Sequence, residues 1–205
     1  MTPALTLVER KRRQARQRII EAARELFLER GFDDVSVGDI AERAEVGRTT
    51  FFRYFGDKQE VVFALEEELL ETITAAAQAD DTPAARNATE AVEQLRPILL
   101  ALCAQATADP EAYTRHFQLI DQHPELRARD AVKMQQIAGK LSDLLVHRGS
   151  DEATAVFAAQ VALACYQTAK RLGNNPRTLV DETRAAFGQA LALGADAAET
   201  EALSP

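Results

Sequence analysis

Apolar residues recur at intervals of three and four along most of this chain, whereas the alternation of apolar and polar residues that marks a strand is almost absent. Such intervals place apolar side chains on one face of a helix, so the pattern predicts an all-α fold. No apolar run approaches the roughly 18 residues that a membrane-spanning helix requires, and no apolar stretch follows the first charges as in a secretory signal. We therefore expect a cytoplasmic protein without a membrane segment.

Glycines, prolines and capping residues divide this pattern into separate helices. Ser36, with Asp39 three residues later, predicts the start of the second helix through a capping box. The expected helices span about 12–30, 37–44 and 48–55, then a long helix at 58–77, and finally 84–106, 110–122, 124–147, 151–173 and 177–193.

Charge is unevenly distributed along the chain, although its formal net charge is −8. Residues 1–60 hold 12 Lys and Arg against 11 Asp and Glu, a net of +1, which leaves −9 for the remainder. Six basic residues gather near the N-terminus: Arg10, Lys11, Arg12, Arg13, Arg16 and Arg18. Residues 1–13 are predicted to form a basic flexible arm, either as a solvated tail or as a contact for a polyanion.

The segment from Ser36 to Phe55 combines two short helices with a turn of about three residues that contains glycine. Apolar faces on both helices can lock them at a steep angle, which is helix-turn-helix geometry. The second helix could then enter the major groove of DNA. It carries Arg48 and two threonines on one side, and Phe51 and Phe55 four residues apart on the other. An ordinary pair of helices joined by a glycine turn is the alternative interpretation.

The run FLERGFDDVSVGDIAERAEVGRTTFFRYFGDKQEVVFA resembles the N-terminal DNA-binding domain of TetR-family transcriptional regulators, over roughly residues 14–65. About a dozen positions of the family pattern match without a gap. The resemblance implies a three-helix helix-turn-helix domain at 14–57 that binds double-stranded operator DNA. The later helices resemble the family only in number, length and order.

Residue by residue, the resemblance implies roles for eight positions in DNA binding. Arg48, Thr49, Thr50 and Phe52 would face the groove. Ser36, Tyr54 and Lys58 would lie nearest the phosphates, and Arg53 could serve either role. Elementary chemistry agrees, because arginine can bond guanine through two hydrogen bonds and a threonine methyl can meet a thymine methyl. Phe27, Ile40, Ala41, Val46, Phe51 and Phe55 are expected to form the core of the domain.

Three positions depart from the family pattern. The family often has Gly in place of Glu45, Ser or Thr in place of Gly47, and Tyr in place of Phe52. Glu45 would strain a turn that favours a left-handed backbone, Gly47 is a weaker helix cap than serine, and Phe52 has no hydroxyl for a phosphate.

For residues 58–194 the resemblance implies a larger helical domain that dimerises and binds a small-molecule effector, with 58–77 as its connecting helix. A homodimer would form through the helices near 151–173 and 177–193, whose stripes include Val156, Gln160, Leu163, Ala164, Thr183 and Phe187. Candidate effector contacts on the helices from 84 to 147 are Leu99, Cys103, Tyr113, His116, Phe117, Ile120, Met134, Ile137 and Leu141, although core packing would give the same pattern. Residues 195–205 are expected to be a disordered tail.

Other classes of function have less support in the sequence. None of the common nucleophile, phosphate-loop, dinucleotide or zinc-protease patterns occurs, so we expect no enzyme and no cofactor, and His116 and His123 lack partners at metal-ligand spacing. Two alternatives stay open: a redox-sensing DNA-binding regulator that uses Cys103 or Cys165, and a dimeric helical adaptor that binds no DNA. The effector, the operator sequence and the regulated genes have no sequence signature.

Overall fold

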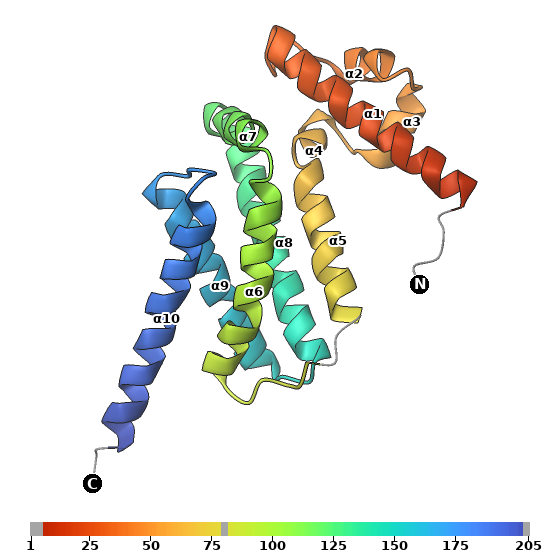
Figure 1. Cartoon of the computed structure of the whole chain (residues 1–205). Coiled ribbons are helices and arrows are strands. Elements are labelled where there is room, and N and C mark those ends of the chain that lie inside the picture. Colours follow the sequence, from red (N-terminus) through yellow and green to blue (C-terminus); the bar gives the residue numbers. More distant parts are fainter. Residues whose placement is uncertain (1–5, 79–81, 203–205) are drawn as a thin grey trace. The chain divides into compact units, whose positions relative to one another are not determined.

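The computed structural model describes residues 6–78 and 82–202, and within them it contains ten helices and no strand (Figure 1). The all-α prediction is therefore confirmed. The helices are α1 (Leu7–Arg30), α2 (Val37–Arg43), α3 (Arg48–Tyr54), α4 (Lys58–Val62), α5 (Ala64–Gln78), α6 (Ala88–Ala106), α7 (Pro110–Gln122), α8 (Pro124–His147), α9 (Glu152–Leu172) and α10 (Leu179–Ala202).

The chain divides into two compact units, residues 1–65 and 66–205. The sequence placed this division at 57/58, before the long helix, whereas the structure places it within α5. No helix among the described residues is long and apolar enough to cross a membrane.

The first unit is built around a core that α1 to α4 share. Four of the predicted core residues, Ile40, Ala41, Phe51 and Phe55, are buried, and Phe27 and Val46 are partly buried against them. Arg43 on α2 adds an ion-paired link at the surface, since its guanidinium lies 3.1 Å from Glu25 and 2.8 Å from Glu29 on α1. The predicted core thus fixes the orientation of α2 and α3 on α1.

In the second unit α9 packs against α6, α8 and α10. Its buried face is rich in alanine, with Ala155, Ala158, Ala159, Ala162 and Ala169 all at 1% exposure or less. Small side chains let the neighbouring helices approach closely. The proline inside α6, Pro97, does not end that helix.

Several helix boundaries differ from the sequence prediction, and α6, for example, begins at Ala88 rather than at 84. The expected long helix at 58–77 is wrong, because α4 ends at Val62 and α5 begins at Ala64. Phe63 between them is fully buried, and its N–H donates to the carbonyl of Glu60, three residues back, at 3.2 Å. Residues 7–13 belong to α1, and α10 continues to Ala202, so the predicted arm from Leu7 onward and the predicted tail up to Ala202 are helical. Residues 1–5 of the predicted arm and 203–205 of the predicted tail lie outside the described residues.

Candidate nucleic-acid interface

The turn between α2 and α3 has the geometry that the sequence indicated. Ser36 caps α2 together with Asp39, and α2 ends at Arg43, with Ala44 as its C-cap. Glu45 then takes a left-handed backbone with φ of 53°, so the strain expected at this position is present. The N–H of Val46 donates to the carbonyl of Ala41 at 2.9 Å, which closes the turn before α3 begins at Arg48.

One face of α3 is exposed and carries most of the predicted groove residues. Arg48, Thr49, Phe52 and Arg53 are exposed, Thr50 and Tyr54 are half-buried at its edges, and Phe51 is buried. Phe52 stands out because 55% of it is exposed, with its ring edge-on to Phe51 at 5.5 Å between centroids. The helix therefore presents two guanidinium groups, a threonine and an aromatic ring together.

Ser36 lies in a different environment from this face. Its N–H donates to a carboxylate oxygen of Asp39 at 2.8 Å, and its hydroxyl donates to the same oxygen. These bonds lower the pKa of Asp39 and keep a negative charge beside Ser36. Ser36 thus serves first as the helix cap.

Lys58 holds together parts of the first unit. Its ammonium donates to the carbonyl oxygens of Phe32 at 2.8 Å, Val35 at 3.0 Å and Asp33 at 3.3 Å. Its Nζ also lies 4.3 Å from the centroid of the Phe32 ring. All three donors of the ammonium are therefore used to fix the loop between α1 and α2.

The basic residues of α1 differ in their surroundings. Arg16 is half-buried, donates to the carbonyl of Ala64 at 3.0 Å and lies 5.4 Å from the Phe55 ring centroid. Arg10, Lys11, Arg12 and Arg13 are exposed on the first turns of the helix. Arg18, Arg24 and Arg30 are exposed further along α1, where Arg18 lies 3.9 Å from Glu45 and Arg30 lies 3.5 Å from Asp39. The four residues at 10–13 are therefore the densest group of exposed positive charge on α1.

The comparisons with known proteins agree with this geometry. The family model for bacterial regulatory proteins of the tetR family matches residues 19–65. The transcriptional repressor AcnR of Corynebacterium efficiens is 30% identical over 127 residues, which are 58% of this chain and 67% of AcnR. This chain belongs to the TetR family. It is a DNA-binding transcriptional regulator with a helix-turn-helix, and α2 and α3 are the helices concerned.

Two further TetR-family comparisons extend beyond the matched region. The regulator TcmR of Streptomyces glaucescens is 27% identical over 169 residues, 81% of this chain and 74% of TcmR. The structure of SmeT, a repressor from Stenotrophomonas maltophilia, solved with triclosan, has a TM-score of 0.54, 19% identity, and coverage of 87% of this chain and 90% of SmeT. Several other curated relatives are matched over less than two thirds of their length.

The predicted effector contacts lie on α6, α7 and α8. His116 is half-buried, and the other eight, Leu99, Cys103, Tyr113, Phe117, Ile120, Met134, Ile137 and Leu141, are buried. Three of these are shown in direct contact on α7: the rings of Tyr113 and Phe117 have centroids 4.6 Å apart, and those of His116 and Phe117 4.9 Å. Tyr113 and Phe117 therefore mark where aromatic candidates gather.

A partly buried polar cluster beside these rings was missing from the sequence prediction. Lys170 on α9 donates to Oδ2 of Asp130 on α8 at 2.9 Å, and its Nζ lies 4.0 Å from the centroid of the Phe117 ring. Oδ1 of Asp130 is buried and has no hydrogen-bond partner within the described residues. Tyr113 donates to Asn174 at 2.6 Å. No sequence pattern indicates the cluster, because the bonded partners are 40 and 61 residues apart.

The two cysteines do not suit a redox sensor. Cys103 and Cys165 are 3% and 4% exposed. Burial raises the pKa of Cys103 to about 11 and also raises the pKa of Cys165. Because the thiolate is the reactive form, both thiols stay protonated and inert at neutral pH.

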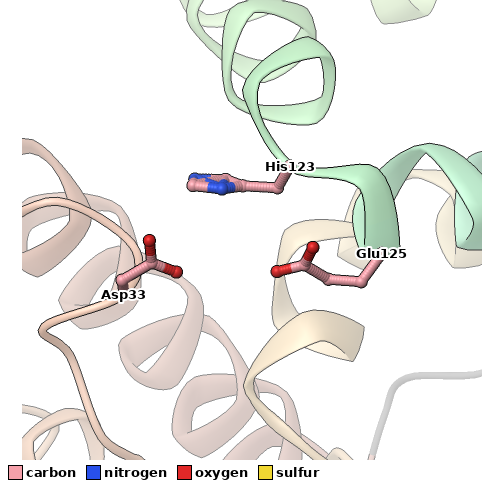
Figure 2. A group of neighbouring side chains, drawn as sticks. All are labelled: Asp33, His123 and Glu125. Atoms are coloured by element: carbon pink, nitrogen blue, oxygen red, sulfur yellow. The ribbon is translucent and has the colours of Figure 1, made fainter.

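Figure 2 shows three side chains of the kind that bind metals, Asp33, His123 and Glu125. Asp33 belongs to the first unit, whereas His123 and Glu125 belong to the second, where His123 precedes the first turn of α8. We infer no metal site from side chains of separate units.

Proposed function

We propose that this protein is a homodimeric repressor that binds a near-palindromic operator in the bacterial cytoplasm, is released by a small, mostly apolar effector, and catalyses no reaction. The observation that carries the DNA part is the exposed face of α3, with Arg48, Thr49, Phe52 and Arg53 side by side. On this face the guanidinium groups supply hydrogen-bond donors, and the Phe52 ring supplies apolar surface. In a groove it gains contact with a thymine methyl.

The structure supports a division of labour among the proposed DNA contacts. Arg48, Thr49, Phe52 and Arg53 face the bases, and the half-buried Thr50 and Tyr54 at the edges of the face lie towards the phosphates. The exposed basic residues 10–13 on α1 add sequence-independent attraction. Ser36 and Lys58 act mainly by holding α2 and its preceding loop in place, because their donors are already bonded.

The second unit supports dimerisation through α9 and α10. From Ala153 to Ala169, α9 contains no charged residue, although several of these positions are exposed. The exposed stripe consists of Val156, Phe157, Gln160, Ala164 and Gln167, whereas Leu163 of the predicted stripe is buried within the unit. Uncharged exposed stripes are typical of the centre of a protein interface. On α10 the small residues Ala185, Gly188 and Ala192 are exposed, next to Arg184, Gln189 and Leu193. Thr183 and Phe187 of the predicted stripe are fully buried within the unit.

The DNA part of this proposal is tested by footprinting on the DNA that flanks the protein's own gene. At about 0.1 M salt the purified protein should protect one near-palindrome, with half-sites centred about 10 bp apart or modestly more, because each chain carries a single recognition helix. A boiled sample of the same protein serves as the control. Absence of any protected site would refute operator binding at this locus.

The effector part is supported by the chemistry around Phe117. Aromatic and aliphatic side chains with few polar groups suit a mostly apolar ligand, and the unpaired Oδ1 of Asp130 suits a hydrogen-bond donor on that ligand. Triclosan, the ligand of the SmeT complex, has this character: an apolar body with one hydroxyl.

Reciprocity gives the effector part a quantitative test. If triclosan lowers operator affinity by a factor of 100, saturating operator must lower triclosan affinity by the same factor, a coupling of about 2.7 kcal/mol. Calorimetric titration with and without operator measures both, with a scrambled duplex as the control. Equal triclosan dissociation constants in the two titrations would show that a ligand bound there does not regulate DNA binding.

A further inference from the structure

Gly38, the second residue of α2, lies directly under the guanidinium of Arg48, the first residue of α3. A methyl group at Gly38 would lie 2.5 Å from Nη2 of Arg48, 3.3 Å from Cζ and 3.4 Å from Nε. The first distance is shorter than side-chain contacts allow, and the other two are tight. The end of the Arg48 side chain therefore occupies the space that any residue other than glycine would fill.

The backbone at Gly38 does not itself require glycine. Of the glycines that the structure describes, Gly31 and Gly149 have a left-handed φ, and Gly38 does not. Within a helix, glycine costs about 1 kcal/mol relative to alanine. In a helix of seven residues this is a large cost. What glycine provides at this position is room for Arg48.

In this arrangement the end of the Arg48 side chain lies against the backbone of Gly38. Among the described residues its guanidinium makes no ion pair or hydrogen bond, and Asp39 on α2 is already bonded to Ser36 and lies 3.5 Å from Arg30. The side chain is exposed, so its donors stay available. Bonding guanine through two parallel N–H groups requires the plane and direction of the guanidinium to be correct.

We propose that Gly38 is a positioning residue for DNA recognition: by leaving space over the first turn of α2, it lets the Arg48 guanidinium lie across α2 in the direction needed to read a base pair. The inference rests on the proposed operator binding. Gly38 itself contacts no base; it acts through Arg48. A side chain at this position pushes the guanidinium aside and weakens sequence discrimination, while the fold is retained because the displaced atoms are the end of a flexible side chain.

The test is a double-mutant cycle on the full-length protein with Gly38→Ala, Arg48→Ala and the double variant. Affinity for the footprinted operator and for a scrambled duplex is measured for each. We expect Gly38→Ala to reduce the operator-to-scrambled affinity ratio about tenfold, and Arg48→Ala to reduce it by a similar factor. In the double variant the ratio should equal that of Arg48→Ala alone, since Gly38 acts only through Arg48.

Two further measurements separate this role from a structural one. Thermal unfolding should show Gly38→Ala to be at least as stable as wild type, because alanine favours the helix. Gly139→Ala in α8, where an added methyl meets no atom within 4 Å, should leave the ratio unchanged. A tenfold loss that persists in the Arg48→Ala background, or an unchanged ratio for Gly38→Ala, overturns the inference. Wild-type protein that binds no operator overturns the proposed function instead, and this inference with it.

Discussion

Replacing Phe157 with glutamate is expected to convert the proposed dimer into monomers and to lower operator affinity at least 100-fold. Phe157 is 57% exposed and Val156 beside it 47%, in the middle of the uncharged stretch of α9. A glutamate there would place one carboxylate from each protomer in an apolar interface without partners, which is costly. A single helix-turn-helix module also buries too little surface for tight specific binding.

Size-exclusion chromatography with light scattering measures the mass, and a DNA titration measures the affinity. Val132→Glu is the matched control, since Val132 on α8 is also exposed, at 56%, but lies outside the stripe of α9 and α10. The control should stay dimeric and bind the operator normally. A dimeric Phe157→Glu with wild-type affinity would show that the protomers meet elsewhere.

Replacing Lys58 with methionine is expected to lower the free energy of unfolding of the first unit by about 1.5–3 kcal/mol, the range for hydrogen bonds to a charged group. Methionine keeps the length of the side chain but removes the donors, and the partly buried carbonyl oxygens of Phe32 and Val35 lose their partner. Urea unfolding measures the loss.

Lys140→Met on α8 is the control for this prediction, because Lys140 is exposed and its ion pair with Asp143 at 3.6 Å is on the surface. Its stability should change by less than about 0.5 kcal/mol. If Lys58 served mainly as a phosphate contact, Lys58→Met would instead keep full stability and reduce the salt dependence of DNA binding by about one phosphate. That result would restore the role implied by the resemblance.

The sequence predicted the helical fold and the turn between α2 and α3 because both leave local signals. The capping box at Ser36 and Asp39 and the apolar spacing within α3 depend on neighbours a few residues away. The break at Phe63 leaves no such signal, since no glycine or proline occurs there and the break accompanies full burial of that side chain. The predicted flexible arm was wrong from Leu7 onward, where α1 begins. Lys and Arg favour helices, so a cluster of positive charge does not by itself indicate a flexible segment.

The site was predicted least well where side chains bond to backbone or to distant partners. Lys58 donates to backbone carbonyl oxygens 23 to 26 residues away. Every residue has a backbone carbonyl, so no residue type in the sequence marks these partners. The contact between Gly38 and Arg48 depends on the angle between two helices. The face of α3, in contrast, follows from helical periodicity once Phe51 is known to be buried.

We propose that the exposed face of α3 reads DNA sequence through Arg48. The most direct measurement is the ratio of affinities for the footprinted operator and a scrambled duplex at about 0.1 M salt, for wild type, Arg48→Ala and the control Arg115→Ala, whose side chain is on α7. We predict a ratio of at least about 1,000 for wild type and for the control, and a ratio 5 to 150 times lower for Arg48→Ala. A wild-type ratio near one, or a ratio that Arg48→Ala leaves unchanged, would contradict it.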